Sequence, residues 1–163
     1  MEQLFNQLSE KLLKSLDADE HMKVSIDGEN SQFVRFSQSK VRQAGLVDDA
    51  SLSISLIKDG RTCSGSFTLT GNSETDEKTA YMELERMREE VVSLPKDPFV
   101  VLPEDTGSSR EDHNGSLLSQ ENAVSALSPA MQGVDLAGIW ASGRIFTGNA
   151  NSAGQKHWFA TDT

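Results

Sequence analysis

The sequence contains little of several residue types whose abundance marks particular classes of protein. Cys63 is the single cysteine, which excludes an internal disulfide framework and is typical of a protein kept in the reducing cytosol. The longest apolar runs extend over only a few residues, so none is long enough to cross a bilayer. The first residues, Met1-Glu2-Gln3, lack the basic stretch and apolar core of a signal peptide. These absences predict a soluble, cytoplasmic protein.

Positive charge is also scarce. The 15 Lys and Arg residues are outnumbered by 25 Asp and Glu residues, which gives a net charge of −10. Binding to a phosphate backbone or to an anionic membrane needs clustered basic side chains, so we expect no nucleic-acid partner and no membrane partner. The length of 163 residues fits one domain of about 100–200 residues. The hydrophobic share of 36% lies below the roughly 45–50% of ordinary globular chains, which predicts a modest core.

The spacing of apolar residues predicts two helices and, less regularly, a third. The first helix is amphipathic, and its apolar face consists of Leu4, Phe5, Leu8, Leu12, Leu13 and Leu16. The second starts at a capping box formed by Ser73 and Asp76, and Pro95 closes it. The third starts near Ser119, and Pro129 predicts that it is either kinked or begins later.

Between residues 22 and 69 the apolar period changes to two, which is typical of half-buried strands. Leu52, Ile54 and Leu56 alternate with serines, and Asp59-Gly60 is a favoured pair for a tight hairpin. Residues 27–30 are expected to form a turn, and residues 48–49 a break between strands. Residues 104–116 have no large apolar side chain and are expected to form a loop or linker, whereas residues 134–163 predict a terminal hairpin.

These elements together predict an α+β fold. The sheet is expected to be mostly antiparallel with about four or five strands, accompanied by two or three helices and the C-terminal hairpin. We expect all of it to form a single domain over residues 1–163.

Side chains that carry catalysis or bind metals are sparse. His21, His113 and His157 have no second His or Cys at the spacing of a metal-binding pair, and the acidic residues before His113 make it at most a weak cation site. Cys63 has neither a neighbouring His nor a helix N-terminus, so it is expected to be a structural thiol. No nucleophile elbow, P-loop or dinucleotide fingerprint occurs. We therefore expect no catalytic residue, no metal ligand and no cofactor in this chain.

A run of small residues near the end of the sequence carries a family resemblance. Gly148-Asn149-Ala150-Asn151-Ser152-Ala153-Gly154, followed by Trp158, resembles the Gly-x-Ala-Asn-Ser-x-Gly signature of the TldD/PmbA family, also called modulator of DNA gyrase or microcin-processing peptidase. Residues 33–36 and 39–45 resemble the N-terminal strand pair of that family. The hairpin at 57–61 and the segment Asp97-Pro98-Phe99 fall in the expected order, so the resemblance runs from about residue 33 to residue 163.

The resemblance implies a connection with zinc metallopeptidases. Family members with peptidase activity resemble zinc metalloproteases that use a His-Glu-x-x-x-His helix and a later ligand in a C-terminal domain, whereas PmbA-like members lack that motif and pair with a TldD-like partner. This sequence contains no such motif. It therefore resembles an N-terminal domain, either a piece of a longer protein or a naturally short form, with the C-terminal metal-binding domain absent. Zinc is expected only in a full-length TldD-type protein, and the motifs do not decide between a TldD-like and a PmbA-like chain.

By resemblance, the domain encloses a peptide substrate and associates with a TldD/PmbA-like subunit as a homodimer or heterodimer. In the small-residue turn, Asn149, Asn151, Ser152 and Gly154 are candidate peptide contacts, because Asn and Ser bond to backbone groups and Gly permits close approach. A tight hairpin turn near a domain junction is the alternative interpretation of these residues. For the whole chain, the alternative is a stand-alone module that binds a protein or peptide outside any peptidase assembly.

Overall fold

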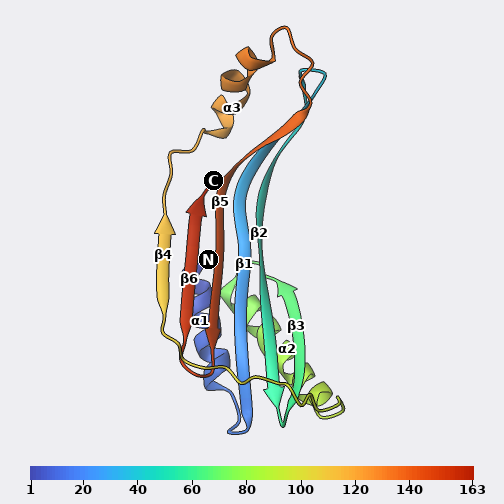
Figure 1. The fold of residues 1–163 in the computed structure, drawn as a ribbon, viewed down its shortest axis with the longest axis vertical. Helices are drawn as coiled ribbons and strands as arrows, with labels where there is room; N and C mark the ends of the chain where they lie inside the picture. The colour runs from blue at the N-terminus through green and yellow to red at the C-terminus, as the bar shows by residue number, and fades with distance from the viewer. The chain divides into compact units, whose positions relative to one another are not determined.

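The computed structural model describes residues 1–163, except for the side chain of Gln120. It confirms the predicted α+β fold, and Figure 1 shows its helices and strands. The elements in chain order are α1 (Glu2–Lys14), β1 (Glu20–Ser37), β2 (Lys40–Lys58), β3 (Arg61–Thr68), α2 (Ser73–Val91), β4 (Ser109–His113), α3 (Gln120–Leu127), the 3-10 helix η1 (Ser128–Met131), β5 (Gly138–Asn151) and β6 (Lys156–Asp162). The strands are hydrogen-bonded in the order β3-β2-β1-β5-β6-β4, which makes a 6-stranded sheet.

The chain forms two compact units that share the three longest strands. Unit 1 comprises residues 1–27, 50–111 and 147–159, and unit 2 comprises residues 28–49, 112–146 and 160–163. Each of β1, β2 and β5 therefore contributes one part to unit 1 and the other part to unit 2. The single domain over residues 1–163 stays a prediction.

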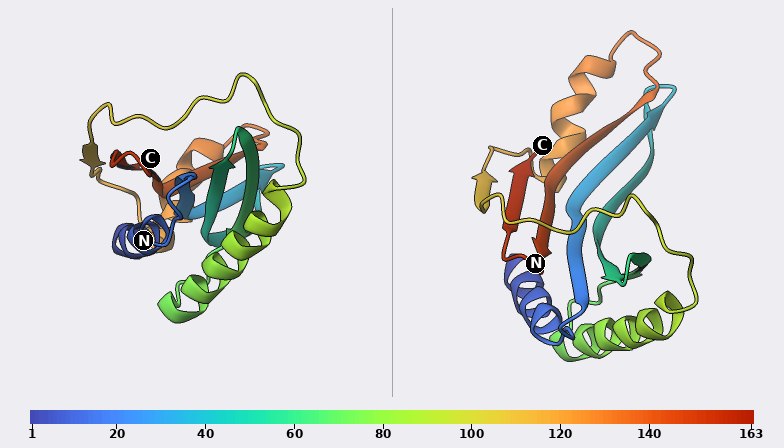
Figure 2. Two further views of the ribbon diagram at one scale, coloured as in Figure 1. Left: turned by 90° about the horizontal axis from the view of Figure 1, so that it is seen from below. Right: turned by 60° about the horizontal axis from the view of Figure 1, so that its bottom comes forward.

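The core of unit 1 lies between its strands and the two longer helices. From α1, the side chains of Phe5, Leu8 and Leu12 are buried, at an exposed fraction of 2% or less. The helix α2 contributes the buried stripe that its spacing predicted. In β1 and β2 every second residue points into this core: Met22, Val24, Ile26, Leu52, Ile54 and Leu56. Figures 1 and 2 show both helices on one side of these strands.

The other face of the unit 1 sheet is polar. The hairpin β2–β3 turns at Asp59-Gly60 as predicted, and its register pairs Ser53 with Ser66 and Ser55 with Ser64. Because Leu52, Ile54 and Leu56 point to the helices, the alternating serines point away from them. The chain between α2 and β4 crosses this serine face on the side opposite the helices (Figure 2, left). Residues 94–108 are called the crossing segment below.

A buried ion pair connects the ends of several elements in unit 1. The side chain of Glu20, at the start of β1, is fully buried. Its carboxylate accepts hydrogen bonds from Arg88 of α2 at 2.7 Å and from Lys58 of β2 at 3.3 Å. The Arg88 guanidinium also donates to the carbonyl oxygen of Ser15, just after α1, at 2.8 Å. Since every charge in this cluster has a partner, the burial of Glu20 is compensated.

The core of unit 2 is smaller. Val34 and Phe36 of β1 pack with Ala123 of α3 and Met131 of η1 as its buried centre. Four partly buried apolar residues surround them: Leu118, Leu127, Leu136 and Trp140. The loop before β5 is attached by Ser39, whose hydroxyl donates to the carbonyl oxygen of Val134 and accepts from the amide of Leu136 at 2.9 Å.

The predicted turn at residues 27–30 is wrong, because β1 runs through them without interruption. Gly28 is required there by a close approach instead of by a turn. A Cβ at this position would lie 2.5 Å from the ring of Phe146 and 2.5 Å from the carbonyl oxygen of Asp49. The predicted break at residues 48–49 is also wrong, since β2 continues through it. The turn between these strands lies at Gln38 and Ser39, both with positive φ.

The structure also differs from the predictions at the start of α2, at the end of α3 and in the expected loop over residues 104–116. The N-cap of α2 is Asn72, which accepts from the amide of Thr75, whereas Asp76 reaches back to the amides of Thr70 and Gly71. The residues expected to form the capping box therefore do not form it. Helix α3 ends at Leu127, and η1, which contains Pro129, begins at Ser128. The expected loop over 104–116 contains β4, which brings the sheet to one strand above the predicted range.

Candidate functional site

The candidate site is built around the turn between β5 and β6, and its first residues serve packing. A Cβ on Gly148 would lie 2.8 Å from the ring of Trp158 and 3.0 Å from both Ile26 and Phe5. Ala150 is likewise buried, at 3% exposure. The rings of Phe5 and Trp158 are 6.1 Å apart, a distance within the range of favourable aromatic pairs. The small residues at these two positions therefore admit an aromatic contact between α1 and β6.

Asn151 holds the turn together. Its side-chain oxygen accepts from the amides of Ala153 at 2.9 Å and Gln155 at 3.2 Å, as in an Asx turn. Its amide nitrogen donates to the side chain of Gln155 at 3.1 Å and to the carbonyl oxygen of Glu104 at 3.2 Å. Gly154 has a φ of 101°, which few residues with a side chain adopt. These two candidate residues thus shape the turn and fasten the crossing segment to it.

Ser152 attaches the turn to β1. Its hydroxyl accepts from the amide of Met22 at 3.1 Å, and its own amide donates to the carbonyl oxygen of Met22 at 2.9 Å. The side chain is therefore engaged within the protein. The hairpin interpretation describes Asn151, Ser152 and Gly154 well, and their contact with a peptide stays a prediction.

Asn149 differs from these residues because its side chain lines a hollow. Since its neighbours Gly148 and Ala150 face the helices, Asn149 points to the opposite, polar face of the sheet. Its side chain makes no hydrogen bond within the described part of the chain. Of the four candidate residues, Asn149 is the one best placed for a ligand.

The hollow at Asn149 lies between the crossing segment and the sheet, with a volume of about 380 Å³. Its floor is polar and its other wall is largely apolar. The lining residues are Lys23, Ser55, Ile57, Val101, Leu102, Pro103, Glu104, Thr106, Asn149, Asn151 and Gln155. A hollow of this size lies within the range of about 300–1,000 Å³ that small ligands occupy.

The crossing segment is fixed at both ends of its path over the sheet. At one end, the amide of Asp97 donates to the carbonyl oxygen of Gly60 at 2.7 Å, and the Arg61 side chain donates to the carbonyl oxygen of Leu94 at 2.8 Å. At the other end, the hydroxyl of Ser108 accepts from the amide of Lys156 at 2.9 Å. Between these anchors, the apolar side chains include Phe99 at 85% exposure and Val101 at 79%. The crossing segment therefore spans the hollow, is held by hydrogen bonds at both ends, and carries apolar side chains in between.

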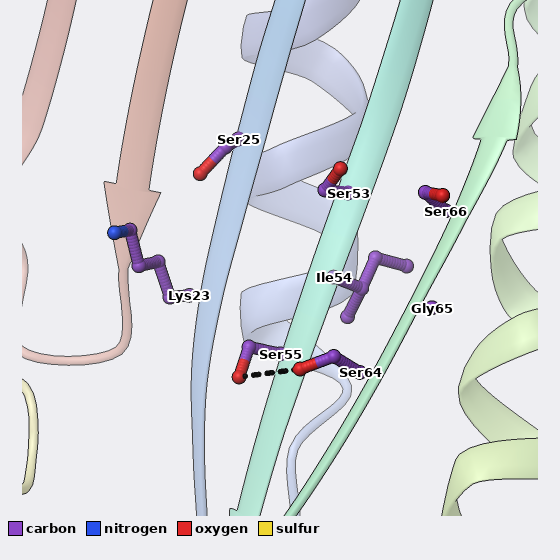
Figure 3. Close-up of a pocket in the computed structure, with 8 residues that line it drawn as sticks. All are labelled: Lys23, Ser25, Ser53, Ile54, Ser55, Ser64, Gly65 and Ser66. Carbon is purple, nitrogen blue, oxygen red and sulfur yellow. Dashed lines mark hydrogen bonds between the residues drawn. The ribbon is translucent and has the colours of Figure 1, made fainter.

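A second hollow of about 340 Å³ lies beside the first on the serine face (Figure 3). It is lined by Lys23, Ser25, Ser53, Ile54, Ser55, Ser64, Gly65 and Ser66. One hydroxyl pair is already satisfied, because Ser64 donates to Ser55 at 3.1 Å. Lys23 and Ser55 line both hollows, so the two form a continuous polar surface across β3, β2, β1 and β5.

Sequence reasoning missed Lys23, Ser55 and the crossing segment as parts of this site. The alternation around Ser55 showed that it faces away from the core, but no local signal placed it near Asn149. The two residues lie on different strands, β2 and β5, and β1 lies between them. Only the strand order brings them together.

The environment of Cys63 is that of a structural thiol. Burial raises the pKa of the Cys63 thiol, and the nearby Glu90 carboxylate raises it further, so the thiolate is disfavoured. Cys63 is buried, as its structural interpretation predicted. Among the described residues, no three His, Cys, Asp or Glu side chains are grouped as a metal site requires. Within the same residues, no helix is both long and apolar enough to cross a membrane.

The fold of the whole chain matches that of two solved structures. One is a candidate modulator of a DNA gyrase from Thermotoga maritima, with a TM-score of 0.60 and 14% identity. The other is TldE from Thermococcus kodakarensis, with a TM-score of 0.61 and 16% identity. Each match covers 99% of this chain. The chain has a TldD/PmbA-like fold. This confirms the fold that the family resemblance implied.

The TldD/PmbA-like fold is supported by structure and not by sequence comparison. No family model matches the sequence, and no curated protein matches it. The chain spans 37% of the length of each of the two solved structures. At these identities, the likeness concerns the arrangement of the backbone, so activity has to be argued from the site.

Proposed function

We propose that this chain serves as a non-catalytic domain of a TldD/PmbA-like metallopeptidase, where it encloses peptide substrate and takes part in subunit association. The observation that carries the proposal is the fold likeness over 99% of the chain to a protein named TldE and to a candidate gyrase modulator. A stand-alone interaction module would not need to reproduce that fold from end to end. The assembly is proposed to be cytoplasmic and to be a homodimer or a heterodimer with a TldD/PmbA-like subunit.

The polar hollow supplies the peptide-holding part of the proposal. Its floor offers the unengaged amide of Asn149 and the hydroxyl of Ser55, which suit the N–H and C=O groups of an extended peptide. Its opposite wall, with Val101 and Leu102, suits an apolar side chain of the same peptide. Such a combination of apolar wall and few polar groups is common in ligand sites.

Zinc chemistry is assigned to another polypeptide segment in this proposal. The described residues of this chain do not fit a zinc site, because no cluster of three ligands is present among them. The zinc is therefore expected in a TldD-type domain that carries the His-Glu-x-x-x-His motif, and this chain contributes binding and enclosure.

The direct test is co-expression with a TldD-type chain that carries the His-Glu-x-x-x-His motif. We expect the two chains to co-purify and to cleave an unfolded peptide in a zinc-dependent manner, faster than the TldD-type chain alone. A failure to form any complex, together with unchanged cleavage, would contradict the proposed assembly.

A variant pair separates peptide holding from assembly. Asn149→Trp fills the hollow and is expected to slow peptide cleavage by the complex while the two chains still co-purify. Gln3→Trp adds the same bulk at an exposed position of α1 and is expected to change neither property. Equal cleavage rates in both variants would exclude the hollow as the peptide contact.

A further inference from the structure

Lys23 lies at the centre of the polar surface, where the two hollows meet. Its neighbours Met22 and Val24 are fully buried under the sheet, so the alternation of β1 turns Lys23 to the outer face. Lys23 lines both hollows and is drawn between β1 and the end of β5 in Figure 3. Ser55 on β2 and Asn149 on β5 line the larger hollow with it.

The charge of Lys23 is available to a ligand. Within the described part of the chain, its ammonium makes no ion pair, whereas Lys58 and Lys11 are neutralised by Glu20 and Glu77. Among the described side chains that line the two hollows, Lys23 is the sole cation. The neighbouring groups are hydroxyls and an amide, which can donate hydrogen bonds without adding charge.

An anion is the ligand that this set of donors recognises. An ammonium flanked by a hydroxyl and an amide N–H group suits a carboxylate, which accepts several hydrogen bonds at once. Among the described residues that line the larger hollow, Glu104 is the one acidic residue, and its backbone oxygen accepts a hydrogen bond from the Asn151 amide. Because Glu104 lies on the crossing segment and Lys23 on the floor, the hollow has a positive and a negative wall.

We propose that Lys23, with Ser55 and Asn149, binds the C-terminal carboxylate of a bound peptide whose last side chain is apolar. The carboxylate meets the ammonium on the floor, while Val101, Leu102 and Ile57 form the adjoining apolar surface for the last side chain. This assignment rests on the proposed peptide-holding function and adds the end of the peptide that is recognised. It also gives the peptide a direction, with its C-terminus at Lys23.

The test compares a peptide acid with its amide. The N-acetylated hexapeptide Ala-Ser-Ala-Leu-Ala-Leu, with either a free carboxylate or a C-terminal amide, is titrated into the 15N-labelled chain. The dissociation constants and the shifts of the Asn149 side-chain amide are followed by NMR. An exposed ion pair is worth about 0.2–1 kcal/mol, so the acid is expected to bind roughly 1.4-fold to fivefold more tightly than the amide.

Two lysine variants test whether the preference for the peptide acid depends on Lys23. Lys23→Gln is expected to bind acid and amide equally, with the affinity of the wild type for the amide. Lys78→Gln removes an exposed lysine of α2 that makes no ion pair among the described residues, and it is expected to keep the preference for the acid. The wild-type preference is also expected to fall when ionic strength rises from about 0.02 M to about 0.5 M, because salt screens exposed charges.

The outcomes separate this inference from the function on which it rests. Equal binding of acid and amide to the wild type, with Asn149 still shifting, overturns the carboxylate site and leaves peptide holding intact. A preference that persists in Lys23→Gln also overturns it. If neither peptide shifts any resonance of the hollow, both the carboxylate site and peptide holding by this hollow are overturned. Sodium acetate alone, which lacks the apolar side chain, is expected to bind more weakly than the peptide acid.

Discussion

Unit 1 and unit 2 share three long strands but stabilise their parts of them by different means. In unit 1, two helices of 13 and 19 residues cover one face of the strands, and side chains such as Leu84 and Met87 are fully buried. In unit 2, the covering helix α3 has 8 residues, and much of the apolar surface stays half-buried or exposed, as with Leu46 at 70%. Burial is thus deep in one unit and shallow in the other.

The ion pairs of the two units also differ in burial. The ion pair of unit 1 surrounds a fully buried carboxylate, that of Glu20. In unit 2, Arg144 binds Asp112 and Asp162 in a cluster whose members all keep some contact with solvent. The residues of the candidate site all belong to unit 1, the more deeply packed of the two units.

The first prediction compares the same truncation in the two cores. Leu84→Ala in α2 is expected to lower the free energy of unfolding by about 3–4 kcal/mol, because a fully buried side chain leaves a cavity. Leu127→Ala in α3, at a half-buried position, is expected to cost about 1 kcal/mol.

The two tryptophans allow each unit to be followed separately. Trp158 belongs to unit 1 and Trp140 to unit 2, so urea unfolding of variants that keep one tryptophan reports on one unit. Equal costs for Leu84→Ala and Leu127→Ala would show that the two cores do not differ in depth as described.

The second prediction concerns the buried ion pair. Burial alone would raise the pKa of Glu20, but hydrogen bonds from Arg88, from the backbone N–H of Asp17 and from Lys58 outweigh it and hold the pKa below its ordinary value. Glu20→Gln removes a buried charge and leaves Arg88 without its main partner. We expect a loss of about 2–3 kcal/mol at pH 7, somewhat below the cost for a fully buried pair because Arg88 keeps other contacts.

The effect of the Glu20 ion pair on the free energy of unfolding depends on pH. Because the folded pKa of Glu20 is depressed, its stabilisation is present above the unfolded pKa of about 4.3 and is lost as the pH falls through the folded pKa. The wild type should therefore lose more stability than Glu20→Gln between about pH 6 and pH 3. Arg144→Met in unit 2 is expected to have a smaller effect at pH 7, since its partners are partly exposed. Parallel pH profiles for wild type and Glu20→Gln would argue against the description of this ion pair.

The third prediction compares two glycines of β5. Gly148→Ala places a methyl group within 2.8 Å of Trp158 and 3.0 Å of Phe5, and overpacking of this kind costs about 1–3 kcal/mol. Gly138→Ala, in unit 2, meets no atom within 4 Å and is expected to be neutral or slightly stabilising. Thermal unfolding measures the stability of both variants. If Gly148→Ala were as stable as the wild type, the close contact at the aromatic pair would be excluded.

The fourth prediction compares two serines that lie in turns between strands, and each of them fastens its turn to another segment of the chain. Ser39→Ala in unit 2 removes two hydrogen bonds, to Val134 and from Leu136, and is expected to cost about 1–2 kcal/mol. Ser152→Ala in unit 1 removes one, from the amide of Met22, and is expected to cost about 0.5–1 kcal/mol. Chemical denaturation measures both. If Ser152→Ala cost more than Ser39→Ala, unit 2 would not depend on such hydrogen bonds more than unit 1 does.

Local features of the fold were predictable from the sequence. Asp59-Gly60 sits between two alternating runs, and both residues take the positive φ that a tight hairpin needs. The apolar stripes of α1 and α2 follow from helical spacing alone. Gly28 misled the prediction because glycine signals a turn when only neighbours in sequence are considered. Its real partner, Phe146, lies 118 positions away, and only the pairing of β1 with β5 brings them together.

The candidate site was predictable in part for the same reason. The small-residue signature drew attention to Asn149, Asn151, Ser152 and Gly154, but it did not distinguish the residues that shape the turn from the one that faces the hollow. That distinction depends on which face each residue takes in β5 and on what the opposite side of the sheet contains. The role of Lys23 depends on the same tertiary arrangement, and a lone lysine in an alternating strand carries no signal of it.

The position of β1 in the sheet has a consequence for synthesis on the ribosome. β1 pairs with β2 soon after both strands have left the exit tunnel, but its other partner, β5, begins about a hundred residues after β1 has ended. During that interval one edge of an 18-residue strand is without its native neighbour. At about 5–20 residues per second the exposure lasts roughly 5–20 seconds, which is long enough for a chaperone or a second nascent chain to reach the open edge.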